Sequence, residues 1–363
     1  MAAGIKNVVD WWLLVAILPM LGAGLTIVGL GRQIIWLIVG LIIFFLFAHI
    51  DWRFLKTSGL LLFLFVVSLL SLVFLLFLGQ IIRGSASWFR FAFFSIEPAE
   101  PIKLFLILIL AKYFSRRHIE IAHIKHIFIS GIYAALPAAL VFLQPDFGSA
   151  MVFVFIWLGM VMISGISKKH LLLVFLLFCL LFSVSWFLVL KPYQKARVAS
   201  FLNPLADPQG SGYNALQSMV AIGSGQVWGK GFGYGTQSRL EFLPEYKTDF
   251  VFAAFAEEWG FAGVFIIFCC FAILIWRILR NAYFGQTNFE RLFGVGLSIF
   301  LMTHFCLHAG MNLGLLPITG LSMPFMSYGG SHLITVFAGL GILMGMRKYS
   351  RVARQADKTI DMF

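Results

Sequence analysis

Charged residues are scarce in this chain, and long apolar runs take their place. Only 12% of the 363 residues are charged, whereas 61% are hydrophobic. A water-soluble domain is nearer half apolar and a quarter charged, so this composition excludes an ordinary soluble fold. A run of about twenty apolar residues spans a bilayer core of roughly 30 Å. We therefore expect an integral membrane protein.

Cysteine is also rare, and its placement excludes two kinds of site. The four cysteines are Cys179, Cys269, Cys270 and Cys306, and all lie inside apolar runs. They lack the spacing of a zinc site, and none lies in a loop where a disulfide would join two segments. Because free cysteine is usually buried, we expect them to be packing residues.

The apolar runs predict an all-α integral membrane fold with about ten transmembrane helices, and residues 1–363 form a single membrane domain. The predicted spans are 11–30, 34–50, 60–78, 102–114, 127–143, 150–166, 171–190, 250–279, 292–313 and 333–346. The eighth span is long and is interrupted by Glu257 and Glu258. An even number of spans puts both chain termini on the same side of the membrane.

Basic residues indicate which side that is. The loops on the side of the termini carry most of the lysines and arginines, so the positive-inside rule places both termini in the cytoplasm. Residues 347–363 then form a basic cytoplasmic tail. The net charge of +12 is spread over short loops, which favours contact with anionic lipid and argues against nucleic acid as a partner.

Residues 191–249, between the seventh and eighth spans, form a large loop that this orientation places outside the cytoplasm. The loop is too long for a simple connection. Aromatic residues distinguish it from a disordered linker, and we expect it to be ordered. They are Tyr193, Phe201, Tyr213, Trp228, Phe232, Tyr234 and Phe242.

Many of the few acidic residues fall at or near this outer face. They are Glu97, Glu100, Asp146, Asp207, Glu241, Glu245, Asp249, Glu257 and Glu258. The same face carries Arg83, Arg90, Lys103, Lys191, Lys195, Arg197, Lys230 and Arg239. Charge placement alone is equally consistent with two readings. Cations and carboxylates would bind a phosphate-bearing lipid substrate, or they would pair with each other and order the loop.

Two local patterns have simpler structural interpretations. Asp146 lies at a Pro-Asp-Phe-Gly break between two spans, where it would form a helix turn and cap the next helix. His304 and His308 are four residues apart but lack the glutamate of a metalloprotease motif, so we interpret them as packing residues or interhelical hydrogen-bonding groups.

Several motifs in a fixed order resemble one family. They are Gln-Pro-Asp-Phe-Gly-Ser at 144–149, Gly-Lys-Gly at 229–231, Phe-Leu-Pro-Glu at 242–245, Thr-Asp-Phe at 248–250 and Pro-Phe-Met-Ser-Tyr-Gly-Gly at 324–330. With the large loop after the seventh span, the chain resembles the SEDS family of bacterial cell-wall proteins over essentially its whole length. Phe-Leu-Asn-Pro at 201–204 and Thr-Gln-Ser at 236–238 favour its elongation branch, RodA, over its division branch, FtsW.

The resemblance implies roles for individual residues. Asp249 matches the loop aspartate that the family requires, and its role is either that of a base or that of a ligand for a divalent cation, Mg or Mn. Arg197 and Lys230 match cations that would stabilise a pyrophosphate. The other residues assigned to substrate binding are Glu100, Lys103, Asp146, Gln237 and Glu245. The chain departs from the family pattern at Ser87, Glu97, Ala99, Pro101 and Lys247.

The resemblance also implies an activity. Such a protein polymerises lipid II, the undecaprenyl-pyrophosphate-linked disaccharide-pentapeptide, at the outer face of the bacterial inner membrane during elongation. The transfer inverts the anomeric centre and uses no nucleotide cofactor. The implied partners are a class B penicillin-binding protein, which is a transpeptidase, and other membrane proteins of the elongation complex. A lipid II transporter (flippase), an FtsW-like division protein and a non-catalytic scaffold remain as alternatives.

Overall fold

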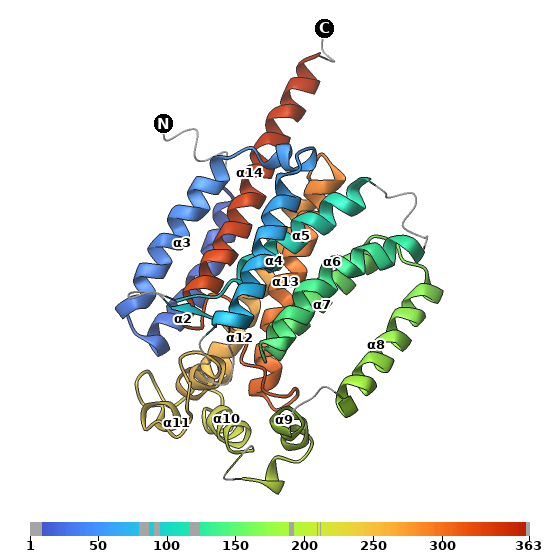
Figure 1. The fold of residues 1–363 in the computed structure, drawn as a ribbon. Helices are drawn as coiled ribbons and strands as arrows, with labels where there is room; N and C mark the ends of the chain where they lie inside the picture. The colour runs from blue at the N-terminus through green and yellow to red at the C-terminus, as the bar shows by residue number, and fades with distance from the viewer. Residues whose placement is uncertain are drawn as a thin grey trace.

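The fold is almost entirely helical (Figure 1), as the sequence predicts. The computed structural model describes residues 9–79, 87–90, 95–116, 124–188, 192–208, 210 and 212–360. Its long helices are α2 (Trp11–Val28), α3 (Gly31–His49), α4 (Leu60–Leu78), α5 (Ala99–Arg116), α6 (Ile124–Leu143), α7 (Phe147–Ile163), α8 (Lys168–Leu188), α12 (Val251–Tyr283), α13 (Asn288–Asn312) and α14 (Gly330–Ile360). A short 3-10 helix, η1 (Trp52–Lys56), precedes α4, and β1 (Phe89–Arg90) pairs antiparallel with β2 (Ser95–Ile96).

Each predicted span coincides with one of these long helices. Within the described ranges, 7 helices are long and apolar enough to cross a membrane, and parts of α3 and α7 are apolar but shorter. Four charged side chains near the two ends of α5, those of Glu100, Lys103, Lys112 and Arg116, lower its average hydropathy. The multi-pass membrane fold is confirmed, whereas the number of ten membrane crossings remains a prediction.

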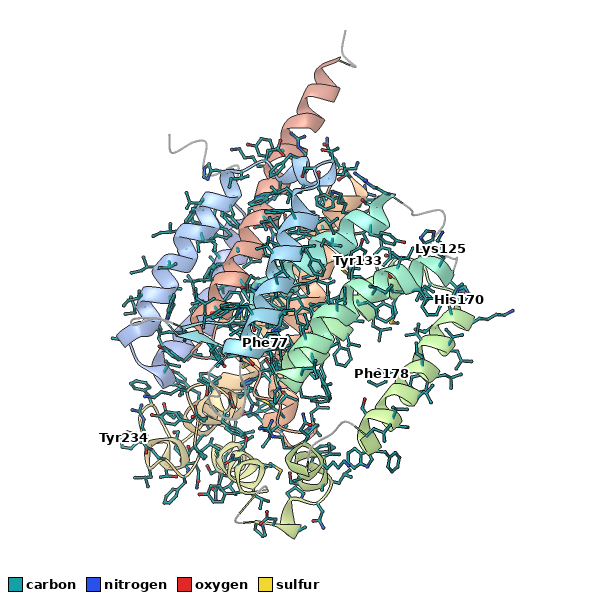
Figure 2. All side chains as sticks on the ribbon, in the orientation of Figure 1. Phe77, Lys125, Tyr133, His170, Phe178 and Tyr234 are labelled. Atoms are coloured by element: carbon teal, nitrogen blue, oxygen red, sulfur yellow. The ribbon has the colours of Figure 1, made fainter. Side chains whose placement is uncertain are left out.

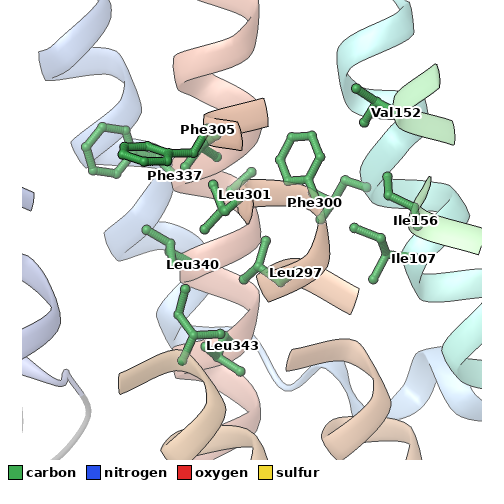
Figure 3. Packing of buried hydrophobic residues seen from close by; sticks show 14 of the residues in the cluster. Ile107, Val152, Ile156, Leu297, Phe300, Leu301, Phe305, Phe337, Leu340 and Leu343 are labelled. Carbon is green, nitrogen blue, oxygen red and sulfur yellow. The ribbon is translucent and has the colours of Figure 1, made fainter. Parts of the chain in front are cut away.

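The helices α13 and α14 form the centre of the bundle. Their apolar windows are 67% and 83% buried inside the protein. Figure 3 shows Leu297 and Leu301 of α13 close to Leu340 of α14, with Ile107 of α5 on the other side. Lipid tails are as apolar as these side chains, so close packing rather than exclusion from water holds such helices together. This centre provides a rigid frame for the polar groups described below.

The helix α8 stands apart from the bundle in Figure 1, and none of its apolar window is buried. Phe178, labelled on this helix in Figure 2, is 53% exposed. A helix that is apolar all round and uncovered by protein has to be surrounded by lipid. The exposure of its apolar residues therefore supports the assignment of α8 as the seventh membrane span.

The cysteines do not all behave as predicted. All four are free, but Cys179, Cys269 and Cys306 lie on exposed helix surfaces and only Cys270 is partly buried. The prediction that they are packing residues is wrong for the three exposed ones. The reason is that an apolar run in a membrane helix has a face turned to lipid as well as a face turned to protein.

The long segment before α12 contains short helices and is ordered where the structure describes it. They are α9 (Pro192–Leu202), η2 (Pro204–Ala206), α10 (Tyr213–Ser224) and α11 (Thr236–Arg239). In Figure 1 these elements gather at one end of the bundle, and the end of α14 projects from the opposite end. The position of this loop outside the cytoplasm remains a prediction.

A buried carboxylate ties the start of α2 to the ends of α12 and α14. Asp10 accepts hydrogen bonds from Arg277 (2.6 Å) and Asn281 (3.0 Å), and its carboxylate lies 3.2 Å from the guanidinium of Arg347. Burial alone would raise the pKa of Asp10, but the hydrogen bonds and the arginine charges outweigh it and lower the pKa. The beginning of α2 and the basic tail therefore share the end of the bundle that lies opposite α9–α11.

This arrangement predicts the result of a labelling experiment. In a background with the four native cysteines replaced by serine, a cysteine at the 72% exposed position Leu205 should react with an impermeant maleimide added outside intact cells. A cysteine at the partly exposed position Lys348 should react only after the inner face is opened. Reversal of the two patterns would contradict the predicted orientation.

Candidate functional site

Asp249 lies two residues before the first residue of α12, Val251, and its backbone forms hydrogen bonds that hold it there. Its N–H donates to the carbonyl of Glu245 (3.1 Å), and its carbonyl accepts from the side-chain amide of Asn312 (3.0 Å). The side-chain oxygen of Asn312 also accepts from the N–H of Ala253 (3.2 Å). Phe250, and not Asp249, is the residue at the N-cap position of α12. The side chain of Asp249, which is partly exposed, is therefore placed for a role other than that of the N-cap residue.

The Pro-Phe-Met-Ser-Tyr-Gly-Gly motif braces the chain just before Asp249. The hydroxyl of Ser327 donates to the carbonyl of Thr248 (2.7 Å), and the N–H of Tyr328 donates to the carbonyl of Lys247 (2.8 Å). These contacts join two motifs that the sequence separates widely. Both motifs therefore contribute to the position of the turn that carries Asp249.

Asp249 faces the segment 319–322. A Cβ added at Gly320 would lie 3.6 Å from a carboxylate oxygen of Asp249. Gly320 has φ +72°, a conformation that favours glycine. Gly148, near the start of α7, packs against the same segment, since a Cβ there would lie 2.7 Å from the carbonyl oxygen of Thr319. The segment 319–322 thus lies between Asp249 and the start of α7.

A buried polar centre lies on the other side of this segment. The ammonium of Lys103 donates to Glu100 (2.7 Å) and lies 3.3 Å from Nε2 of His304. Nδ1 of His332 lies 2.9 Å from the second carboxylate oxygen of Glu100. All four residues are at most 4% exposed. Nδ1 of His304 contacts the carbonyl of Ser322 (3.1 Å) in the segment between α13 and α14. The contact between His304 on α13 and Lys103 on α5 confirms the predicted interhelical hydrogen bond at this histidine.

Sequence reasoning assigned Glu100 and Lys103 but missed His332. His332 follows a Gly-Gly pair at the start of α14, and nothing in its local sequence indicates a carboxylate partner on α5. Its Nε2 is buried and has no hydrogen-bond partner among the residues that the structure describes. The partnership depends on the packing of α14 against α5, which no sequence spacing encodes.

Three residues of this centre could hold a metal ion by geometry. Ligand atoms of Glu100, His304 and His332 lie within 4.8 Å of one another, the one such group found in the part of the chain that the structure describes. The ammonium of Lys103 already contacts two of these residues and supplies the positive charge. Two imidazoles also suit zinc better than Mg or Mn. This centre does not fit the divalent cation that the resemblance implies.

Asp249 fits such a cation in a different way. Mg is usually bound by one or two carboxylates together with substrate phosphates and water, and not by a complete protein cage. A single partly exposed carboxylate beside the binding place of a pyrophosphate would meet that requirement. The residue that would hold the ion is then Asp249, and the cation would neutralise charge on the departing pyrophosphate.

Asp146 caps α7, as predicted, by accepting the N–H of Ser149 (3.0 Å). Burial raises its pKa, although part of the side chain remains exposed. The pKa of Glu97 is raised well above its ordinary value, first by burial and then by the charges of Glu100 and Asp146. The carboxylates of Glu97, Glu100 and Asp146 therefore all interact electrostatically with the ammonium of Lys103.

A second cluster joins the loop to α12. Glu257, which is 0% exposed, accepts hydrogen bonds from Lys230 Nζ (2.8 Å), Thr236 Oγ1 (3.0 Å) and the N–H of Gln237 (3.0 Å). Ser238 adds longer contacts of 3.3 and 3.4 Å. Lys230 is therefore paired with a buried carboxylate, and only 28% of its side chain is exposed.

The loop also fills a break in α12. Gly260 has φ +64° and ψ −168°, so the helix stops there and starts again. The N–H groups of Lys230 and Gly231 donate to the carbonyls of Glu257 and Glu258, each at 3.0 Å. On the other side of the break, Phe261 and Ala262 donate to residues 226 and 227 at 2.8 and 2.9 Å. Sequence analysis placed the interruption at Glu257 and Glu258, just before the observed break.

The remaining predicted residues lie in different surroundings. The carbonyl of Glu245 accepts three N–H groups, from residues 248, 249 and 250, and so shapes the turn that leads to Asp249. The side chain of Arg197 lies exposed on α9, at the same end of the bundle as α10 and α11 (Figure 1). Arg83 and Lys191, two of the predicted outer cations, lie outside the described residues.

Comparison with known proteins then decides the family. The family model of FtsW, RodA and SpoVE, described as cell cycle protein, matches residues 14–352. The chain belongs to this family. It is 35% identical to peptidoglycan glycosyltransferase MrdB of Escherichia coli (strain K12) over 321 residues, covering 88% of this chain and 86% of that protein. It is also 35% identical to stage V sporulation protein E of Bacillus subtilis (strain 168), covering 88% and 87%.

Solved structures of family members share the fold. A chain from a peptidoglycan synthase complex, in which polymerization and crosslinking are coordinated, superposes with a TM-score of 0.80 at 31% identity, covering 94% of this chain and 98% of that chain. The rod shape determining protein RodA of Thermus thermophilus gives a TM-score of 0.69 at 29% identity, covering 93% and 96%. The resemblance to the SEDS family and to RodA is thereby confirmed.

Proposed function

We propose that this family member is a peptidoglycan glycosyltransferase that polymerises lipid II at the outer face of the bacterial inner membrane during cell elongation. The observation that carries the proposal is the placement of Asp249. Its partly exposed carboxylate lies at the start of a membrane helix, braced by two motifs and adjoining the segment 319–322. The names of the relatives favour a polymerase over a lipid II transporter.

The reaction joins two lipid-linked sugars. The 4-hydroxyl of one lipid II attacks the anomeric carbon of the growing chain, the bond from that carbon to the pyrophosphate breaks, and undecaprenyl pyrophosphate leaves. The hydroxyl proton goes to a base. An α-linked donor that gives a β-linked product requires a single in-line displacement with inversion. Pyrophosphate needs no acid to leave, so one base and positive charge around the phosphates are sufficient.

Asp249 is the group we assign to the reacting hydroxyl, as its base or through a divalent cation. Hydrogen bonds from its backbone to the carbonyl of Glu245 and to the side-chain amide of Asn312 fix its position, which a free loop tip would not achieve. The outer cations Arg197 and Lys230 would contact the phosphates, because guanidinium and ammonium groups form charge-assisted hydrogen bonds with phosphate oxygens.

A partner completes the biological role. The solved synthase complex couples polymerization with crosslinking. By this similarity, the chain would work with a class B penicillin-binding protein that crosslinks the glycan it makes.

The proposed function can be tested with the purified protein in detergent solution. The purified chain, without a membrane to transport across, should convert lipid II into a ladder of glycan strands. A chain that moves lipid II between the leaflets of vesicles but yields no glycan would be a transporter, and the proposal would be wrong.

Arg197→Ala should raise the lipid II concentration for half-maximal rate about tenfold. A charge-assisted contact with phosphate contributes roughly 1.5–3 kcal/mol, and Arg197 is exposed on α9, so its removal uncovers no core. The measurement is the initial polymerisation rate as a function of lipid II concentration. Lys195→Ala on the same helix is the control. Equal effects of both variants would show that α9 contributes only general positive charge.

A further inference from the structure

Glu257, one of the acidic residues at the predicted outer face, has no role in the proposed function. Its carboxylate is fully buried and receives the ammonium of Lys230, the hydroxyl of Thr236 and the N–H of Gln237 within 3.0 Å. A buried carboxylate without partners would be strongly unfavourable, so this set of contacts is needed for its charge. The contacts all come from one stretch of loop, residues 230–238.

Two features indicate that Glu257 has a specific effect on Lys230 and its loop. First, it lies in the last turn of α12 before the break at Gly260, and its own carbonyl accepts the N–H of Lys230 (3.0 Å). Backbone and side chain of Glu257 thus both hold Lys230. Second, Gly235 packs against it, since a Cβ there would lie 3.0 Å from a carboxylate oxygen of Glu257. The loop therefore packs closely around the side chain of Glu257.

The arrangement determines how Lys230 can meet a phosphate. An ammonium has three N–H donors. One points to Glu257 and one to Thr236, both at 2.8 Å, which fixes the direction of the third. The side chain remains 28% exposed. A lysine on a flexible loop would lose rotamer entropy on binding, whereas this one is already ordered.

We propose that Glu257 is a positioning residue of the polymerase. It orders residues 230–238 against the end of the first part of α12 and so sets the donor geometry of Lys230 toward an anionic lipid-linked substrate. The inference rests on the proposed function for the identity of that substrate. The ordering of the loop by Glu257 does not depend on the identity of the substrate and can be measured separately.

Neighbouring Glu258 offers a matched control. It is also buried, at 2% exposed, but its charged partner Arg239 lies at 3.3 Å and 46% of the arginine side chain is exposed. Glu258 therefore has the same helix, burial and charge as Glu257 without the contacts to Lys230 and Gln237.

The test compares Glu257→Gln, Lys230→Met, the double variant and Glu258→Gln in the full-length protein. Amide exchange of residues 230–238 should accelerate about tenfold or more in Glu257→Gln, because hydrogen bonds to a charged group are lost, and should stay near the wild-type rate in Glu258→Gln. Glu257→Gln should also raise the half-saturating lipid II concentration about tenfold while the maximal rate changes much less.

The double variant, Glu257→Gln with Lys230→Met, distinguishes a positioning role of Glu257 from a general effect on protein stability. If Glu257 acts through Lys230, the double variant should be no worse in lipid II use than Glu257→Gln alone. Unchanged exchange in the loop, or effects of the two substitutions that multiply, would overturn the proposal. If Glu257→Gln does not accumulate, Lys230→Met decides: loss of the ammonium that pairs with Glu257 should accelerate amide exchange of residues 230–238 and raise the half-saturating lipid II concentration. Unchanged exchange or normal lipid II use in Lys230→Met would contradict the inference. Absence of glycan from the wild-type protein would refute the proposed function, whereas the exchange data would still test Glu257.

Discussion

Asp249→Asn should abolish polymerisation of lipid II while the protein inserts and accumulates normally. Asparagine has nearly the same shape, and the substitution keeps the backbone hydrogen bonds of this residue with Glu245 and Asn312. A neutral amide, however, is neither a base nor a strong ligand for Mg or Mn. The measurement is the glycan yield of the purified variant at saturating lipid II, compared with the wild-type protein.

Glu245→Gln is the matched control for Asp249→Asn. Glu245 is exposed, lies in the same turn and contributes its carbonyl to three N–H groups, and the substitution leaves that carbonyl in place. Its side chain also accepts from the hydroxyl of Thr248 (3.0 Å), which glutamine can replace. We expect a much smaller loss than for Asp249→Asn. Equal losses would show that negative charge in this turn matters in general and that Asp249 has no special role.

Lys103→Met should destabilise the whole protein. The substitution leaves Glu100 buried without its ammonium partner, and removal of one member of a buried ion pair is destabilising by about 3–5 kcal/mol. His332 remains in contact with Glu100 but cannot replace the contact to the opposite oxygen. The measurement is the thermal midpoint in detergent together with the yield of folded protein.

Two comparisons make this second prediction specific. The double substitution Glu100→Gln with Lys103→Met removes both charges and should recover much of the lost stability. Lys125→Met, at an exposed lysine on α6 (Figure 2), should change the thermal midpoint little. A single Lys103→Met protein as stable as the wild type would show that the buried pair does not support the fold.

The sequence was informative about features that depend on local composition. Apolar runs such as 60–78 and 292–313 correspond closely to α4 and α13, because a bilayer imposes the length of each span. Asp146 was correctly interpreted as a helix cap, since capping involves only residues three positions away. These are cases in which neighbours in sequence are also neighbours in space.

Features that depend on helix packing could not be predicted. His332 meets Glu100, and Lys230 meets Glu257, only after distant helices and loops have been brought together. The charge pattern left two readings of the outer cations open, and the structure gives them different environments. Lys230 is paired and partly buried, whereas Arg197 is exposed on a separate helix. Arg197 and Lys230 look equivalent in the sequence, but substitutions at the two positions should therefore have different effects.

The most direct test of Asp249-dependent polymerisation measures both products of the reaction, released lipid and new glycan linkages, in one experiment. Purified wild-type protein and the Asp249→Asn variant are each incubated with lipid II, and the released undecaprenyl pyrophosphate is counted against the sugar linkages formed. The account predicts one lipid released for every new β linkage with the wild-type protein and neither product with the variant. Lipid release without glycan from the wild-type protein, or matched release and glycan from the Asp249→Asn variant, would contradict it.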